Sequence, residues 1–321
     1  MKVLFVWSGL TGYMGDCWRE LAKRDGVELK VTVDLSETHF GGGFKSEEVL
    51  SSLDLSQELP SDWIPDVAFT VGWHNKLCRK TALKYSKLKT QNSKLKLICC
   101  FDMPWEWRLR KIAARFVLWR YLRRFDAAFV PGVSAARYAR WLGFSESKAF
   151  RGLFSTNTRR FDGQHKGGGG FLYVGREVPE KGIDVLRVAH EKYRAQGGKW
   201  PLKIVNGVSP DELGSVYADA DCFVLASRWE PWGVVLVEAA AAGLPIICTD
   251  KCGARHEVVK GNGLVVKAGD ADVMAEAMFK IEHGAADVHP ELGKELSKPY
   301  SCEAWADRVV DICRRLVMQG S

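Results

Sequence analysis

Short runs of β-branched, aromatic and other apolar residues recur along the whole chain, with stretches of helical or loop character between them. This alternation is typical of parallel sheets that helices cover on both faces. A chain of 321 residues also exceeds what one hydrophobic core usually fills. We therefore expect an α/β protein with two doubly wound domains. The predicted strands cover residues 3–7, 28–33, 66–71, 96–101 and 126–131 in the first half, and 171–175, 202–205, 221–226, 244–249 and 264–266 in the second.

The connection between the two domains is expected near residues 155–168. A polar run there leads into four consecutive glycines, Gly167 to Gly170, a composition that favours a flexible boundary over the interior of a helix or strand. We predict one domain over residues 1–157 and a second over residues 158–300.

Composition points to an ordinary globular protein. Hydrophobic residues make up 46% of the chain and charged residues 26%, and no apolar run reaches the roughly 18 to 20 residues of a membrane-spanning helix. The first residues lack the order of charge, apolar segment and cleavage site that marks a secretory signal. Nine cysteines show no C-x-x-C spacing, and the adjacent Cys99 and Cys100 lie in an apolar run. We expect a cytoplasmic protein with neither disulfides nor zinc.

Positive charge is concentrated in residues 84–124, where lysine and arginine alternate with aromatic residues. Apolar residues from Leu109 to Trp119 recur at helical spacing beside a row of cations, which predicts an amphipathic basic helix over residues 106–124. Two interpretations stay open: a solvated face over a packed apolar row, or a surface that places the protein peripherally at the inner face of an anionic membrane. No nucleic-acid-binding module accompanies the patch, so nucleic acid is not expected as a partner.

Two glutamates interrupt the most apolar part of the second half. Glu230 and Glu238 lie in the segment EPWGVVLVEAAAAGLPIICTD, and an acid near a core is costly unless a partner or ligand compensates it. Pro231 suits a first helical position and Gly243 a C-terminal cap, which predicts a helix over residues 232–242 directly after a strand. Glu230 then lies in a strand-to-helix loop at the carboxyl edge of a parallel sheet, where open α/β folds bind ligands.

An elongated ligand with both phosphates and hydroxyls would satisfy this segment. The N-terminus of the predicted helix offers backbone N–H groups to a phosphate, and Gly233 lets that backbone approach closely. Glu238 can accept two hydrogen bonds from a vicinal diol such as a ribose. Glu230 can accept hydroxyls from the group attached beyond the phosphates.

Two cations support the same interpretation. Arg176 follows the strand at 171–175 and Lys181 lies at the opening of the next helix, so both can converge on a diphosphate from one edge of the sheet. A diphosphate leaving group needs such charge neutralisation when no metal is bound. An arginine and a lysine five residues apart are often only a surface pair; together with the glutamate segment they indicate a ligand site.

The segments VGREVPEKGIDVL (174–186) and SRWEPWGVVLVEAAAAGLPIICTD (227–250) resemble the two signature segments of the family 4 glycosyltransferases, retaining enzymes of the GT-B fold. The resemblance implies two Rossmann-like domains that face each other across a cleft, with a C-terminal helix, about residues 301–321, packed back on the first. It implies a nucleoside diphosphate sugar as donor and a glycan or lipid-linked hydroxyl as acceptor, in cell-surface polysaccharide or glycolipid synthesis. No metal and no cofactor are expected.

The resemblance also implies roles for residues of the second, donor-binding domain. Glu238 matches the glutamate that holds the ribose, and Glu230 the one that contacts hydroxyls of the transferred sugar. Arg176 and Lys181 match the pair that stabilises the departing diphosphate. The backbone of Gly233, Val234 and Val235 matches the helix start that meets sugar and phosphate.

The first domain is expected to bind the acceptor. Asp102 lies where relatives place an acid or histidine near the donor sugar, and Gly12 lies in the glycine loop that faces the phosphates. His74 is a candidate acceptor base, although a lone histidine is commonly structural. The chain departs from the family between 205 and 210, where relatives insert a further helix and strand, so the wall that binds the nucleobase is shortened.

Other interpretations stay open. One is a nicotinamide-dependent dehydrogenase, because Gly9, Gly12 and Gly15 with Asp34 follow the order of a dinucleotide-binding fold. The close first pair of glycines in the nicotinamide fingerprint is missing, however. A nucleotide-sugar epimerase, a phosphorylase and a non-catalytic nucleotide-sugar-binding protein are the remaining alternatives. A donor hydrolysis assay with added acceptors separates the enzymes from the binding protein.

Overall fold

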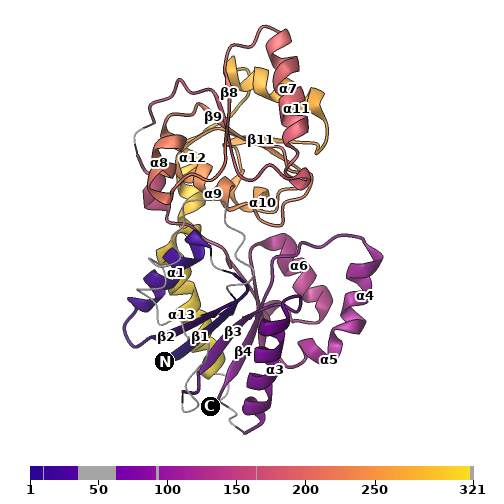
Figure 1. Ribbon diagram of the computed structural model, residues 1–321, viewed down its shortest axis with the longest axis vertical. Helices are drawn as coiled ribbons and strands as arrows, with labels where there is room; N and C mark the ends of the chain where they lie inside the picture. Colours follow the sequence, from indigo (N-terminus) through magenta and orange to yellow (C-terminus); the bar gives the residue numbers. More distant parts are fainter. Residues whose placement is uncertain (10, 35–62, 92–93, 164, 319–321) are drawn as a thin grey trace. The chain divides into compact units, whose positions relative to one another are not determined.

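The computed structural model describes residues 1–9, 11–34, 63–91, 94–163 and 165–318 (Figure 1). Their contacts divide the chain into two compact units. The first unit contains the described residues up to Ser155 together with the segment from Cys302 onward, and the second contains Thr156–Ser301. Each unit is an α/β body with one parallel sheet, so the predicted fold class is confirmed.

The sheet of the first unit has the order β2-β1-β3-β4-β5-β6, and each of its described pairs is parallel. All five strands predicted for this half are present. A sixth, β6, was not predicted, because its three residues are too few to show a pattern. The strands are β1 (Lys2–Trp7), β2 (Glu28–Val33), β3 (Val67–Val71), β4 (Lys96–Cys100), β5 (Ala127–Val130) and β6 (Ala149–Arg151).

The C-terminal helix α13 packs on α1 within the first unit. The Sγ atoms of Cys17 and Cys302 lie 3.4 Å apart, and Trp305 Nε1 donates to the carbonyl oxygen of Leu153 at 2.8 Å. Helix α13 therefore belongs to the same unit as β1, although the two lie at opposite ends of the sequence. The helices of this unit are α1 (Gly12–Ala22), α3 (Lys76–Gln91), α4 (Leu109–Val117), α5 (Trp119–Leu122), α6 (Val133–Leu142) and α13 (Cys302–Met318).

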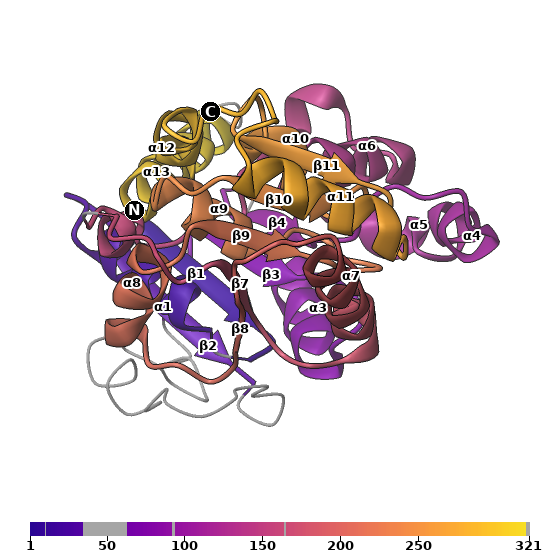
Figure 2. The ribbon, with the colours of Figure 1, turned by 90° about the horizontal axis from the view of Figure 1, so that it is seen from above.

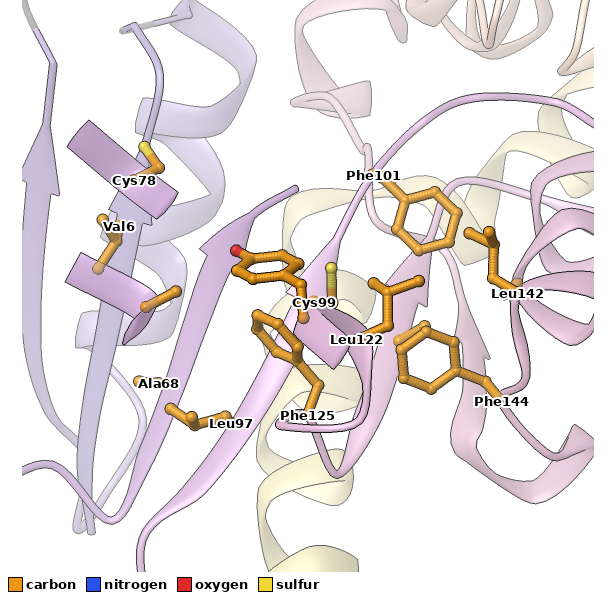
Figure 3. Close-up of a cluster of buried hydrophobic side chains, with 14 of the residues drawn as sticks. Val6, Ala68, Cys78, Leu97, Cys99, Phe101, Leu122, Phe125, Leu142 and Phe144 are labelled. Atoms are coloured by element: carbon orange, nitrogen blue, oxygen red, sulfur yellow. The ribbon is translucent and has the colours of Figure 1, made fainter. Parts of the chain in front are cut away.

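The single basic helix expected over residues 106–124 is wrong in its bounds. The helix begins at Leu109 and is interrupted at Leu118, whose side chain is buried. Below this break the chain enters the core: Figure 3 shows Leu122 and Phe125 near Leu142 and Phe144 within one buried hydrophobic cluster. The core thus anchors α5, whereas α4 contributes no buried residue.

The sheet of the second unit has the order β11-β10-β9-β7-β8, again with parallel pairs throughout its described strands. The five predicted strands of this half are confirmed. They are β7 (Phe171–Val174), β8 (Leu202–Val205), β9 (Cys222–Leu225), β10 (Ile246–Thr249) and β11 (Gly263–Val266).

Helices α7 and α11 lie side by side in the second unit (Figure 2). Helix α8 follows β8 after only residues 206–209, so the short connection expected there is present. Among the residues that the structure describes, every helix is too short or too polar to cross a bilayer. The helices are α7 (Ile183–Ala195), α8 (Pro210–Ala218), α9 (Val234–Ala241), α10 (Arg255–Val258), α11 (Ala271–Glu282) and α12 (Leu292–Ser297).

The glycine run before β7 is held inside the second unit. The carboxylate of Asp221 accepts hydrogen bonds from the backbone N–H groups of Gly168, at 2.9 Å, and Gly170, at 2.7 Å. The N–H of Gly169 donates to the carbonyl oxygen of Asp219 at 2.9 Å. Asp221 therefore has structural partners in the chain itself, and these account for an acid at this position.

Candidate functional site

Three loops meet at the carboxyl edge of the second sheet, because β7, β9 and β10 are neighbours there. The loops after β7 and β9 are joined where the N–H of Arg228 donates to the carbonyl oxygen of Glu180 at 2.8 Å. The loop after β10 is joined to the same segment through Glu230, whose N–H donates to the oxygen of Lys251 at 3.1 Å and whose oxygen accepts from Gly253 N–H at 2.9 Å. Both the N–H and the carbonyl oxygen of Glu230 are thus hydrogen-bonded to the loop after β10.

The side chains of Lys181 and Glu230 form an ion pair at this edge. Lys181 Nζ donates to Glu230 Oε2, and Glu230 is only 8% exposed. The acid that the sequence leaves unexplained is therefore compensated within the protein. The structure brings together one of the two predicted cations and one of the two predicted acids, although they lie 49 residues apart in the sequence.

Two glycines permit this close arrangement of loops. Gly182 has φ 65°, and a Cβ on it would lie 2.3 Å from the carbonyl oxygen of Ala226. Gly233 has φ 92°, and a Cβ on it would lie 3.1 Å from Cγ of Glu230. Since left-handed backbone strains other residues, both positions favour glycine for conformation as well as for space.

Helix α9 begins at Val234, so the predicted start at Trp232 is wrong. Pro231 lies in the loop, and the left-handed backbone of Gly233 precedes the first helical turn. Val234 and Val235 are the first two helical residues. Their N–H groups have no acceptor within the helix, and the positive end of the helix dipole lies there. The start of α9 therefore offers donors beside the Lys181–Glu230 pair.

Glu238 lies one turn into α9 and receives two hydroxyl hydrogen bonds from the protein. Tyr217 Oη donates to Oε2 at 2.9 Å, and Thr156 Oγ1 donates to Oε1 at 3.4 Å. Burial raises the pKa of Glu238 to about 6, and these two hydrogen bonds oppose the rise. A carboxylate has about four acceptor positions, so two donors leave room for the hydroxyls of a ligand.

The sequence pattern did not reveal Tyr217 and Thr156 as site residues. Tyr217 is fully buried near the end of α8, and burial followed by the neighbouring charge of Glu238 raises its pKa well above the usual value. Thr156 lies at the start of the second unit, 82 residues from Glu238. The only signal in the sequence was the position of Tyr217 shortly before β9, the strand that leads into the loop of Glu230.

Arg176 is exposed near the beginning of the loop that follows β7. Tyr173 Oη donates to the carbonyl oxygen of Arg176 at 3.0 Å. The pKa of Tyr173 is raised by burial and then by the charge of Glu230, whereas the charge of Arg176 lowers it. Both charges thus act on one phenol, and Arg176 is free of the core to meet a ligand.

The predicted residues of the first unit share the carboxyl edge of its own sheet. Gly12 is the first residue of α1, after β1; His74 is exposed beyond β3; and Asp102 is partly buried two residues beyond β4. Strands β1, β3 and β4 are neighbours in the order of that sheet. Within the described part of the chain, no group of three or more histidine, cysteine or acidic side chains is placed to hold a metal ion.

The chain is similar to glycosyltransferases in sequence and in fold. The family model described as Glycosyl transferases group 1 matches residues 202–298. The chain is 36% identical over 126 residues, 35% of its length, to TuaC of Bacillus subtilis (strain 168), a glycosyltransferase provisionally assigned to teichuronic acid biosynthesis. It is 40% identical over 65 residues, 19% of its length, to the lipopolysaccharide core biosynthesis mannosyltransferase LpsB of Rhizobium meliloti (strain 1021).

The likeness in structure extends over nearly the whole chain. Anabaena Alr3699/HepE, solved in complex with UDP and glucose, superposes with a TM-score of 0.70 over 98% of this chain and all of that one, at 13% identity. The sequence matches cover only 32% of TuaC and 18% of LpsB. The segment that contains Glu230 and Glu238 thus matches the group 1 glycosyltransferases, and the chain as a whole has the GT-B fold.

Proposed function

We propose that this protein is a glycosyltransferase that moves a sugar from a nucleoside diphosphate sugar to a hydroxyl of a glycan or lipid-linked acceptor. The observation that carries the proposal is the Lys181–Glu230 pair beside the N-terminus of α9, at the meeting point of the β7 and β9 loops. Glu230, Glu238 and α9 all lie in the segment that matches the glycosyltransferase model. A cation that can bind phosphate and an acid that can accept sugar hydroxyls are therefore both present at the carboxyl edge of the second sheet.

The donor is held through its diphosphate and its two sugars. Arg176, Lys181 and the first N–H groups of α9 face the diphosphate, and an ammonium with three N–H donors can keep Glu230 while it binds phosphate. Glu230 accepts hydroxyls of the transferred sugar. Glu238, oriented by Tyr217, accepts those of the ribose.

The reaction retains the anomeric configuration, as the resemblance to family 4 implies. The bond between the anomeric carbon and the diphosphate oxygen breaks, and its electron pair leaves with the diphosphate. The acceptor oxygen bonds to that carbon from the same face, and its proton passes to the leaving phosphate. The cations and the helix N-terminus stabilise the charge that develops, so the step needs neither a metal ion nor a carboxylate nucleophile.

The relatives support a role in cell-surface polysaccharide or glycolipid synthesis. Names of matched proteins include teichuronic acid biosynthesis and lipopolysaccharide core biosynthesis. A structural neighbour holds UDP and glucose, which favours a nucleotide-sugar donor. On this basis the first unit binds the acceptor, with Asp102, Gly12 and His74 at its carboxyl edge, and the reaction takes place in the cytoplasm.

A donor screen followed by product analysis tests the proposal. Thermal shift with UDP-, GDP- and ADP-sugars selects the donor, and proton NMR of the product formed with added acceptors reports the anomeric configuration. We expect transfer with retention that is unchanged by EDTA. Donor binding without transfer or hydrolysis would indicate a binding protein, and free epimerised donor or sugar phosphate would indicate an epimerase or phosphorylase.

Substitution of the cations tests the leaving-group role. We expect Arg176→Ala and Lys181→Met each to lower kcat by on the order of 100-fold, since they remove charge that stabilises the departing diphosphate. Lys181→Met also leaves buried Glu230 without its partner and should lower Tm. Lys192→Met, which breaks an exposed pair with Asp272 of 2.5 Å, is the matched control and should leave kcat unchanged. Near-normal turnover in both Arg176→Ala and Lys181→Met would remove the proposed role.

A further inference from the structure

Helix α4 of the first unit turns its apolar side chains away from the protein. None of its residues is buried, and Leu109, Phe116 and Val117 are 85%, 73% and 78% exposed. The helix lies at the periphery of the first unit (Figure 1), and the view turned by 90° shows the same position (Figure 2). Large apolar side chains gathered in one exposed place usually mark a binding surface.

The small Ala114 packs against the core, and two cations also attach α4 to the unit. Lys111 Nζ donates to the carbonyl oxygen of Pro104 at 2.6 Å and lies 5.7 Å from the ring centre of Tyr138 on α6. Arg115 Nη1 donates to the carbonyl oxygen of Trp141 at 2.6 Å and its guanidinium lies 5.7 Å from that indole. A surface helix of a globular protein usually packs its apolar face against the core, whereas Leu109 and Phe116 of α4 face solvent.

The exposed row continues beyond both ends of α4. Trp107 is 81% exposed before the helix, and Trp119 is 50% exposed after it. Residues 106–124 contain seven arginines or lysines and a single acid, Glu106. Exposed apolar and aromatic side chains thus share one surface with a marked excess of positive charge.

A cavity of about 450 Å³ opens beside α5, next to this row. Its acid, Asp126, is already bound by Lys89 Nζ at 2.7 Å, which leaves the other charged side chains of the wall positive. The cationic part of the lining comes from Arg115, Arg123 and Lys148, and the apolar part from Trp119, Leu122 and Phe125.

We propose that the surface formed by residues 107–123 docks on a membrane that contains anionic phospholipids. The apolar row enters the boundary between head groups and acyl chains, while the surrounding arginines attract the negative surface. The cavity beside α5 takes a lipid phosphate against its cations. Charge complementarity favours a lipid surface over a second copy of this chain, because two copies would bring two strongly basic surfaces together.

Vesicle co-sedimentation tests the docking without any sugar donor, so the result is independent of the proposed reaction. The probes are vesicles of phosphatidylcholine alone and of phosphatidylcholine with about one third phosphatidylglycerol. We expect the protein to bind the anionic vesicles at low salt, and to bind them at least tenfold more weakly in 0.5 M salt or without phosphatidylglycerol.

Two pairs of variants separate the apolar from the electrostatic contribution. Leu109→Ser with Phe116→Ser removes exposed apolar side chains and should weaken vesicle binding by about tenfold or more. Its control, Val188→Ser with Val265→Ser, changes two valines of the second unit that are 43% and 48% exposed.

Arg110→Gln with Arg120→Gln should likewise weaken binding about tenfold, and its control is Lys203→Gln with Lys267→Gln, exposed lysines of the second unit. The proposal would be overturned if either control weakened vesicle binding as much as the variant with which it is paired. So would a lack of binding to anionic vesicles at low salt. A lipid-free dimer that Phe116→Ser dissociates would assign the surface to a second copy instead.

Discussion

A partly buried carboxylate such as that of Glu238 stays useful for ligand binding only if the fold keeps it charged at working pH. Burial raises the pKa of Glu238 to about 6, so the group is still largely ionised near neutrality. Hydrogen bonds from Tyr217 and Thr156 favour the charged form and hold it in one orientation. We regard both hydroxyls as positioning groups, because each acts on a ligand only through Glu238.

Tyr217→Phe tests that positioning. The change keeps the ring in place and removes one hydrogen bond to the carboxylate, so the pKa of Glu238 should rise by on the order of one unit. Donor affinity should then be lost at higher pH than in the unchanged protein, where it is lost as pH falls through about 6. Titration calorimetry with the selected donor between pH 5 and 8 measures the shift.

Tyr193→Phe is the control for this experiment. Tyr193 is also buried in the second unit, and its hydroxyl donates to Glu282 at 2.6 Å, away from the site. It should cost similar stability and leave the pH dependence of donor affinity unchanged. An identical pH profile for Tyr217→Phe and the unchanged protein would contradict the positioning role.

The raised pKa of Glu238 also sets the sign of one contribution to stability. A folded-state pKa above the unfolded value favours the protonated protein, so this contribution is fully present below the usual glutamate pKa. It is lost as pH rises through about 6. Stability and donor binding therefore change in opposite directions across the same pH range.

At the scale of elements, the start of α9 shows what sequence patterns can and cannot predict. The strand before it and the glycine after it were read correctly, because apolar runs and helix ends have strong local signals. The start was misplaced at Trp232, since Pro231 suits a helix but the loop contacts of Glu230 hold that segment extended. The left-handed conformation of Gly233 depends on those contacts between loops, which no local pattern contains.

Gly233→Ala tests whether this helix start forms part of the donor site. An added Cβ is strained at φ 92° and crowds Cγ of Glu230, so stability should fall by roughly 1–2 kcal/mol and donor affinity should fall as well. Gly269→Ala is the matched control, with φ 81° and open space around the added Cβ. It should cost similar stability in a thermal melt with no effect on donor affinity; equal affinity for both variants would contradict the assignment.

The basic segment shows the opposite limit of sequence reasoning. Helical spacing revealed an amphipathic helix but not which face would be buried, so a packed apolar row and an exposed one were both open. The structure places Leu109 and Phe116 in solvent and Lys111 against α6. Tertiary contacts decide orientation, and periodicity alone cannot report it.

For the whole molecule, the two α/β units were predictable from the alternation of strands and helices, because a buried parallel strand leaves a clear apolar run. The short link at 206–209 was equally visible and leaves β8 as the edge strand of a five-stranded sheet. The hydroxyl partners of Glu238 were not predictable. They arise where segments distant in sequence pack together.

The central claim is that cations and acids of the second unit hold one activated sugar. A crystal structure with the donor that gives the largest thermal shift tests it most directly. We expect the diphosphate within hydrogen-bonding distance of Arg176, Lys181 and the N-terminus of α9, and the ribose on Glu238. A donor bound away from these groups would contradict the account.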